Sequence, residues 1–199
     1  MLKAVQGQKR ALIFGGLALV ALSLSACVSI TEVSGPYKTG QATWTLDRSW
    51  NDVTKVTLQT KGIHLLTLDG PVLNSLYLSR GLKEGDYLVR PERRREKTTP
   101  AWRAEMGVLE QVEFVSESVE ALGYTRVVSS QPRPVQVAGQ RGVRFDLVAS
   151  TDAGLDIKGY GQVVSKDGLA YVAIYLSPTE RYFEQTKASA LSAMDSLTF

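Results

Sequence analysis

The N-terminus of the chain constrains the fold most, because it decides how much of the sequence is available to fold. Lys3, Lys9 and Arg10 precede an apolar run over residues 11–24, an order typical of a secretion signal with a basic segment and a short hydrophobic segment. A helix needs about 20 apolar residues to cross a bilayer, so this run is too short to span one. We therefore predict that residues 1–26 are a signal peptide outside the fold.

The apolar run ends in Leu24-Ser25-Ala26-Cys27. This ending resembles the lipobox of bacterial lipoproteins, in which a leucine and two small residues precede an obligatory cysteine. The resemblance implies cleavage before Cys27, transfer of diacylglycerol to its thiol and acylation of the new amino group. Two or three acyl chains hold a protein stably on a membrane. The residue after Cys27 is Val28 and not aspartate. In this position the chain resembles outer-membrane rather than inner-membrane lipoproteins of enteric bacteria. The alternative is an ordinary secretory signal followed by a chance cysteine.

Removal of the signal changes the charge, and lipidation of Cys27 would leave no free thiol. The mature chain keeps 20 of the 23 basic residues against 20 acidic ones, a net charge of zero, so composition gives no reason to expect nucleic-acid binding. Cys27 is the only cysteine, so the mature domain has no internal disulfide. Its core must form by apolar burial alone.

The first half of the mature chain is predicted to begin with a flexible tether over residues 27–40, which is rich in Ser, Thr, Gly and Pro. A single domain over residues 41–199 follows. Its first elements are strands over 42–46 and 63–68, a short helix over 72–78, and a long exposed charged loop over 81–102.

The clearest element is an amphipathic helix that ends at Gly123. Apolar residues recur there at steps of three and four, namely Met106, Leu109, Val112, Val115, Val119 and Leu122. The opposite face carries Glu110, Glu113, Glu117 and Glu120. This spacing predicts one buried and one solvated face.

The second half of the chain predicts an antiparallel meander and a final helix. Short strands are expected over residues 124–129, 135–138, 143–147, 155–165 and 169–177. Asp167-Gly168 lies between two alternating runs and predicts a type I′ hairpin. Ser177-Pro178-Thr179-Glu180 predicts the capped start of a C-terminal helix whose apolar face includes Phe183, Ala190 and Met194.

These elements predict an α+β fold, an antiparallel sheet covered by the mid-chain helix and the long C-terminal helix. The strand-turn-strand over residues 159–177, followed by a helix closing on Ala193-Met194-Asp195-Ser196-Leu197-Thr198-Phe199, resembles the Mog1/PsbP-like fold. That resemblance implies an α/β/α sandwich of the kind found in small envelope lipoproteins of assembly-related or unknown role.

The sequence offers no constellation for catalysis, a metal or a cofactor. His64 is the only histidine. We expect it to be a strand residue that lies at the sheet edge or is partly buried, because histidine-assisted nucleophilic catalysis needs a serine or cysteine partner. No metal-ligand motif is present. Gly159 and Gly161 fall in a predicted strand, where glycines mark a bulge or the close approach of a helix. The helical glutamates have the spacing of a solvated face.

Two groups of residues are candidates for partner binding. Arg93, Arg94 and Arg95 in the charged loop could contact anionic groups, although Glu92 and Glu96 dilute their charge. Arg144, Lys158 and Tyr160 share the sheet face opposite residue Val143, and arginine and tyrosine are common in recognition surfaces. A helix lying over that face would explain the second group equally well.

We therefore expect a non-enzymatic envelope lipoprotein that faces the periplasm from the outer membrane. It would act as a binding or assembly module for another envelope protein or glycan. The alternatives are a carboxylate-dependent cell-wall hydrolase using the helical glutamates, and a carrier of a small ligand or lipid. A hydrolase requires a cleft beside the glutamates, and a carrier requires an enclosed apolar cavity between sheet and helices.

Overall fold

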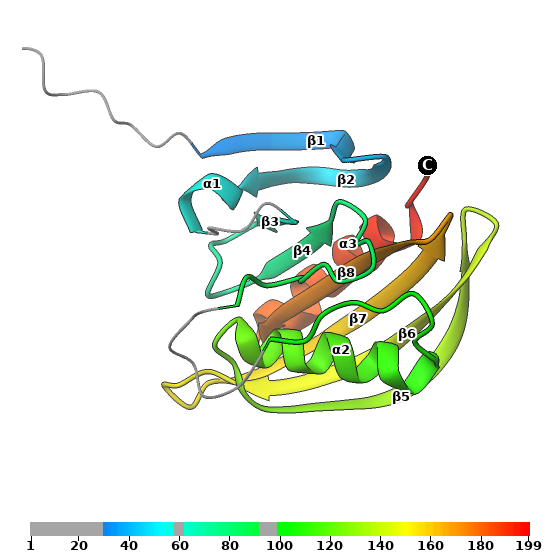
Figure 1. The fold of residues 1–199 in the computed structure, drawn as a ribbon. Coiled ribbons are helices and arrows are strands. Elements are labelled where there is room, and N and C mark those ends of the chain that lie inside the picture. Colours follow the sequence, from blue (N-terminus) through cyan, green and yellow to red (C-terminus); the bar gives the residue numbers. More distant parts are fainter. Residues whose placement is uncertain (1–29, 58–61, 92–98) are drawn as a thin grey trace, which may run out of the picture.

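An antiparallel sheet of eight strands organises the computed structural model, which describes residues 30–57, 62–91 and 99–199 (Figure 1). The sheet order is β1-β2-β3-β4-β8-β7-β6-β5. The elements in chain order are β1 (Thr31–Thr39), β2 (Ala42–Asp52), α1 (Thr54–Thr57), β3 (Ile63–Thr67), β4 (Ser75–Ser79), α2 (Val108–Ala121), β5 (Thr125–Val137), β6 (Gln140–Ser150), β7 (Asp156–Lys166), β8 (Leu169–Pro178) and α3 (Tyr182–Asp195).

The two long helices cover opposite faces of the sheet and give three layers (Figure 1). Helix α2 packs on β5, β6 and β7, whereas α3 packs on β8, β7 and β2. The core under α2 contains Val143, Phe145 and Leu147 of β6, and the core on the other face contains Trp44 and Tyr175. This arrangement confirms the predicted α+β sandwich.

The β1–β2 hairpin joins the sheet by few hydrogen bonds and lies against the C-terminus. Only Asn51 and Asp52 of β2 pair with β3. Near the other end of β2, the Thr43 amide donates to the Thr198 carbonyl at 2.9 Å, and the Thr198 amide donates back at 2.8 Å. The two ends of the described chain therefore support each other.

The predicted tether over residues 27–40 is wrong from residue 31 onward, where the chain forms β1. Thr31 lies opposite Asp52 and Thr39 opposite Ala42, so the Ser, Thr and Gly residues belong to a strand. Cross-strand pairing with a segment farther along the chain outweighs their local preference for loops. Residues 27–29 and the signal peptide lie outside the described residues.

The loop over residues 81–102 is less exposed than predicted. Leu82, Leu88 and Trp102 are each at most 2 % exposed and belong to the core on the α2 side. These apolar side chains are spaced irregularly among charged residues and give no periodic pattern, so their burial could not be predicted from the sequence. Arg93, Arg94 and Arg95 lie outside the described residues.

Three local predictions are also wrong. Residues 72–78 form a turn and then β4 instead of a helix, and the two short strands around Pro132 and Pro134 are one strand, β5. The prolines fit because β5 is an edge strand that bulges between Ser130 and Arg133. The predicted cap at Ser177 fails because β8 continues to Pro178, which pairs with Ile157.

The hairpin and mid-chain helix predictions are confirmed. Asp167 and Gly168 have φ angles of 50° and 76°, both positive as a type I′ turn requires. Helix α2 is followed by Gly123 at φ 101°. The buried face of the helix differs in detail from the predicted one. Leu109, which belongs to the predicted apolar face, is 74 % exposed, whereas Phe114, which does not, is 1 % exposed.

Candidate functional site

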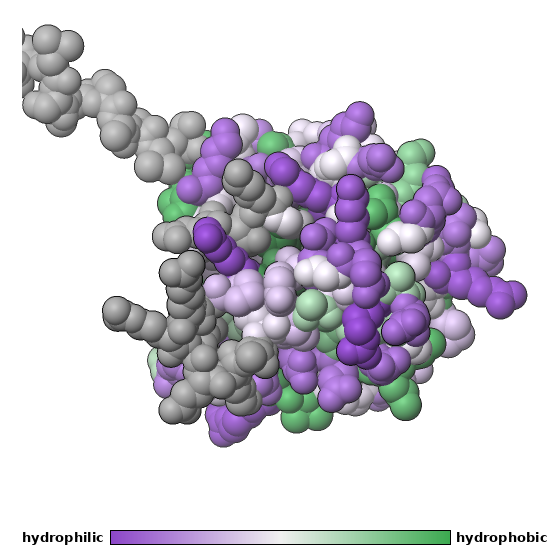
Figure 2. Space-filling model, in the orientation of Figure 1, coloured by the Kyte–Doolittle hydropathy of each residue, from purple (hydrophilic) through white to green (hydrophobic). Residues whose placement is uncertain are grey.

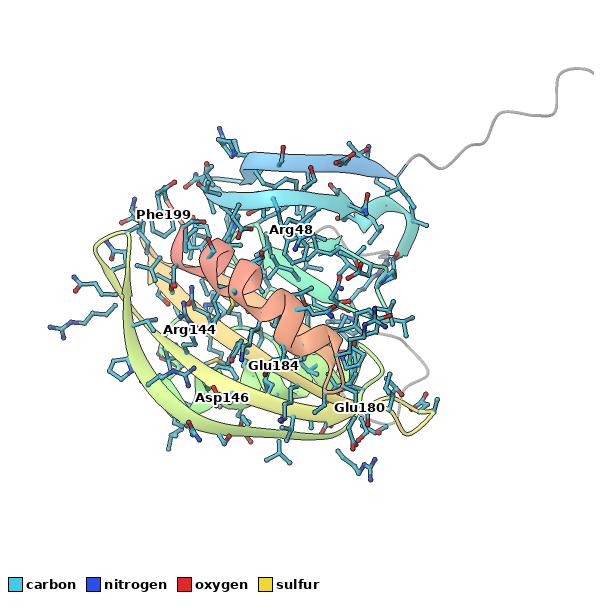
Figure 3. All side chains as sticks on the ribbon, turned by 180° about the vertical axis from the view of Figure 1, so that it is seen from behind. Arg48, Arg144, Asp146, Glu180, Glu184 and Phe199 are labelled. Atoms are coloured by element: carbon cyan, nitrogen blue, oxygen red, sulfur yellow. The ribbon has the colours of Figure 1, made fainter. Side chains whose placement is uncertain are left out.

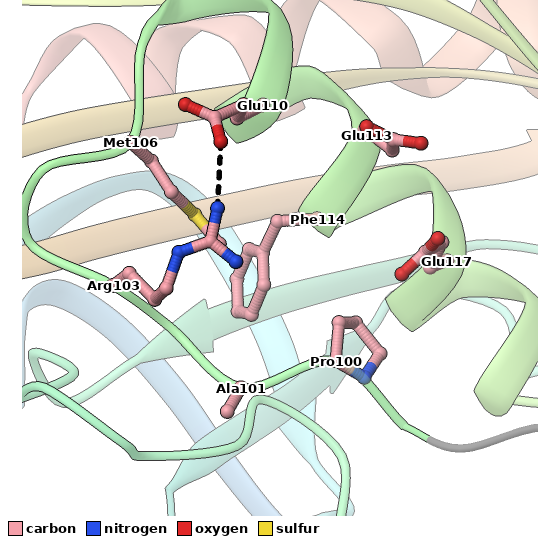
Figure 4. Close-up of a pocket in the computed structure, with 8 residues that line it drawn as sticks. All are labelled: Pro100, Ala101, Arg103, Met106, Glu110, Glu113, Phe114 and Glu117. Atoms are coloured by element: carbon pink, nitrogen blue, oxygen red, sulfur yellow. Dashed lines mark hydrogen bonds and ion pairs between the residues drawn. The ribbon is translucent and has the colours of Figure 1, made fainter.

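A pocket beside helix α2 brings together three of the four helical glutamates (Figure 4). Its volume is about 260 Å³. The lining residues are Pro100, Ala101, Arg103, Met106, Glu110, Glu113, Phe114 and Glu117. One wall is thus the exposed face of the helix, and the other is the segment that leads into it.

The leading segment is held in place by hydrogen bonds to residues 84–86. The Trp102 amide donates to the Asp86 carbonyl at 2.7 Å, and the Gly85 amide donates to the Trp102 carbonyl at 2.8 Å. The Ala104 amide donates to Oε2 of Glu84 at 2.6 Å. The pocket is therefore a built feature of the fold, with a fixed wall opposite the helix.

Apolar groups form the floor of the pocket. Phe114 is almost fully buried, and its ring meets the buried Trp102 ring edge-on with centroids 5.4 Å apart. Met106 and Pro100 add to this floor. Packing against Trp102 fixes the orientation of the Phe114 ring.

Carboxylates form the rim, and they differ in their partners. Glu110 accepts from Arg103 Nη2 at 2.6 Å and from the Gly107 amide at 2.8 Å, so it serves the start of the helix as an N-terminal acceptor. Glu113 and Glu117 form no ion pair with another residue that the structure describes. These two carboxylates are the ones that an incoming cation could reach.

A second polar cluster surrounds His64. Tyr37 Oη donates to Asp52 at 2.8 Å and lies 2.7 Å from His64 Nδ1, and Arg80 Nε donates to His64 Nε2 at 3.1 Å. Since Nε2 accepts from Arg80, we assign the proton of the neutral ring to Nδ1, which then donates to Tyr37. Of the two predicted positions of His64, the partly buried one is confirmed, and β3 lies inside the sheet rather than at its edge.

Burial and charge shift the pKa values of this cluster. Burial lowers the pKa of His64, and the positive charge of Arg80 lowers it further. Burial raises the pKa of Tyr37, with a further contribution from its hydrogen bond to Asp52. Burial acts to raise the pKa of Asp52, but hydrogen bonds from Thr54 and Tyr37 outweigh it and hold that pKa below its usual value. The cluster ties β1, β2 and β3 together through one neutral histidine.

Of the three sheet-face candidates, Arg144 lies beside helix α3 in Figure 3. Arg144 donates to Gln162 Oε1 and pairs with Asp195, while the Tyr160 ring contacts the Phe183 ring with centroids 5.7 Å apart. Lys158 is exposed on the same strand as Tyr160. The contacts of Arg144 and Tyr160 with helix α3 thus account for these residues without a partner. A partner contact at the sheet face stays a prediction.

Two further features are missing from the residues that the structure describes. None of their helices is both long and apolar enough to cross a membrane. None of their histidine, aspartate and glutamate side chains form a group of three that could hold a metal ion.

Comparison with known proteins shows the fold. No protein-family model and no curated protein sequence matches the chain. The Ran-binding protein Mog1p of Saccharomyces cerevisiae is similar in structure, with a TM-score of 0.50 and 9 % identity over 85 % of this chain and 96 % of that one. Cyanobacterial PsbP (CyanoP) of Synechocystis sp. PCC 6803 is similar with a TM-score of 0.52 and 12 % identity, over 85 % of this chain and 92 % of that one.

The chain thus has a Mog1/PsbP-like α+β fold. At these identities the likeness extends to the fold alone, so function has to be argued from the chain's own residues.

Proposed function

We propose that the chain is a lipid-anchored envelope protein that acts as a non-enzymatic binding or assembly module. In this proposal Cys27 carries the anchor, and the α2 pocket receives a basic side chain of a protein partner. The similarity to Mog1p, whose name describes a Ran-binding protein, is consistent with a fold that can serve protein binding.

The chemistry of the pocket carries the proposal. Lysine and arginine side chains have an apolar stem and a charged head. The partly exposed Pro100 and Ala101 suit the stem, and the Glu113 and Glu117 carboxylates suit the head. Hydrogen bonds between charged groups are roughly twice as strong as neutral ones, so the rim would also favour arginine or lysine over neutral residues.

Photo-crosslinking in intact cells tests the pocket. A photoreactive amino acid at Leu109, which is 74 % exposed on the first turns of α2, should capture a specific protein. The double variant Glu113→Gln/Glu117→Gln should reduce that product severalfold. A matched control, Glu180→Gln/Glu184→Gln, removes the same charge at and just before the start of α3 (Figure 3) and should leave it unchanged. Equal yields in both variants would contradict the proposal.

Metabolic labelling tests the anchor separately. An acyl-chain analogue should label the wild-type protein and not Cys27→Ser, because the thiol accepts the lipid. Label that persists on the serine variant would rule out Cys27 as the attachment site.

One observation favours the hydrolase as a second candidate, since a pocket does lie beside three glutamates. Purified protein incubated with peptidoglycan decides between the two. Release of soluble fragments that is lost in Glu113→Gln or Glu117→Gln would support the hydrolase over the binding module. A carrier is less well supported, because buried side chains of two core clusters occupy the layers between sheet and helices.

A further inference from the structure

The folded domain begins very close to the residue that would carry the lipid. Ile30 is the first described residue and β1 starts at Thr31. Only Val28 and Ser29 separate Ile30 from Cys27, and three chain steps span at most about 11 Å. A lipid on Cys27 would therefore hold this end of β1 next to the membrane surface, whatever path the linking residues take.

Three segments meet at this end of β1. Thr31 lies opposite Asp52 at the end of β2, and α1 follows directly. Asn51 Nδ2 donates to the Leu68 carbonyl at 3.4 Å, which joins β2 to the turn between β3 and β4. Figure 1 shows α1 and this turn on the side of the molecule where β1 begins.

Each of the three segments exposes one aliphatic side chain. The exposed fractions are 58 % for Ile30, 51 % for Val56 of α1 and 68 % for Val72 in the β3–β4 turn. Single exposed apolar residues are common and need no explanation. Here, however, one lies on each of the three segments that meet at the start of β1, and Figure 2 shows apolar surface near the point where the described chain begins. Aliphatic groups held at a membrane surface bind in proportion to the apolar area that they bury.

We propose that Ile30, Val56 and Val72 form a membrane-seating surface on which the domain rests against the lipid bilayer. This inference rests on the lipidation of Cys27 in the proposed function. The nearby exposed charges are Glu32, Lys55 and Asp69, which sum to a net negative charge, so the contact does not depend on anionic lipid. The opposite end of β1, with the β1–β2 turn, then points away from the membrane.

Fluorescence quenching on the full-length lipidated protein tests this orientation. In phosphatidylcholine vesicles, an environment-sensitive dye is attached to a cysteine introduced by Val72→Cys or, as the matched control, by Gln41→Cys. Gln41 lies in the turn after β1, about 30 Å from Thr31 at the usual rise of ~3.3 Å per strand residue. Cys27 is blocked by its lipid and does not take the dye.

Nitroxide-labelled lipids should quench the dye at position 72 severalfold more than the dye at position 41, and added anionic lipid should not change the ratio. Equal quenching on protein that floats with the vesicles overturns the seating surface and leaves the anchor intact. Protein that fails to float overturns both. A dye at position 72 that is shielded in cells but not quenched in vesicles assigns the surface to a protein partner and likewise overturns the inference.

Discussion

Single side chains decide how the β1–β2 hairpin is held to the rest of the sheet. Tyr37 of β1 reaches both Asp52 of β2 and His64 of β3 with one hydroxyl group. His64 is kept neutral by its surroundings, since burial and Arg80 both disfavour a second proton on the ring. The cluster therefore links stability to pH.

Acidification should destabilise the domain through His64. Its folded-state pKa is lowered, so below the unfolded pKa of about 6.5 the unfolded chain binds a proton that the folded chain resists. This stability is fully present above that pH and is lost as pH falls through the folded pKa. Denaturant titrations between pH 7.5 and 5 should show the free energy of unfolding falling, and His64→Gln should remove that part of the decline. An unchanged slope in the variant would contradict this role.

The hydroxyl of Tyr37 can be tested by itself. Tyr37→Phe keeps the ring and removes the hydrogen bonds to Asp52 and His64. The expected loss is about 1–2 kcal/mol of unfolding free energy, the usual cost of deleting a part-buried hydrogen-bonding group. Chemical denaturation at pH 7.5 measures it. Tyr87→Phe is the matched control, because Tyr87 is 42 % exposed, and it should cost much less.

At the scale of elements, local patterns predicted the helix and the hairpins but failed where distant segments pair. The glutamates at steps of three and four were visible in the sequence, and they do line α2. The pocket beside them was not, because its other wall depends on hydrogen bonds between Trp102, Gly85 and Asp86. Strand β4 was mistaken for a helix because it is buried on both faces and so lacks the alternation of a half-exposed strand.

The strand glycines of β7 do mark a close approach, but not the approach of a helix that the sequence predicts. Gly161 lies opposite Phe145 of β6, and a Cβ atom at Gly161 would sit 2.3 Å from Phe145 Cζ. The aromatic ring covers the glycine backbone, an arrangement that stabilises glycine in a sheet. The predicted neighbour was a helix or a bulge, whereas the structure shows a ring of the adjacent strand.

Gly161→Ala should therefore disturb the core under α2. Phe145 is fully buried and has to move to admit a methyl group, so we expect a loss of about 1–3 kcal/mol, typical of overpacking. Thermal unfolding measures it, with the exposed β7 residue Ser165 changed to alanine as control. If Phe145→Leu, which replaces the ring with a smaller side chain, restores stability to Gly161→Ala, the cause is the clash with the ring.

For the whole molecule, the two ends of the described chain form one structural unit. The sequence predicts a tether over residues 31–39, because no pattern within these residues indicates that β1 pairs with β2. Nor does a local pattern indicate that β2 contacts the C-terminal residues. The contacts that decide it are distant, as between Thr43 and Thr198. Leu197, 1 % exposed, also packs in the core that contains Trp44.

Deletion of residues 196–199 should accordingly loosen the opposite end of the chain. It removes the Thr43–Thr198 hydrogen bonds, the donation from the Thr45 amide to Ser196 Oγ and the burial of Leu197. Burial of a leucine alone is commonly worth about 2–5 kcal/mol. Amide hydrogen exchange should show lost protection across β1 and β2 while β6, β7 and β8 keep theirs, since their ladders do not involve these residues. Uniform loss across all strands would instead mean that the hairpin and the central sheet unfold as one cooperative unit, and unchanged protection in β2 would show that the C-terminus does not hold the hairpin.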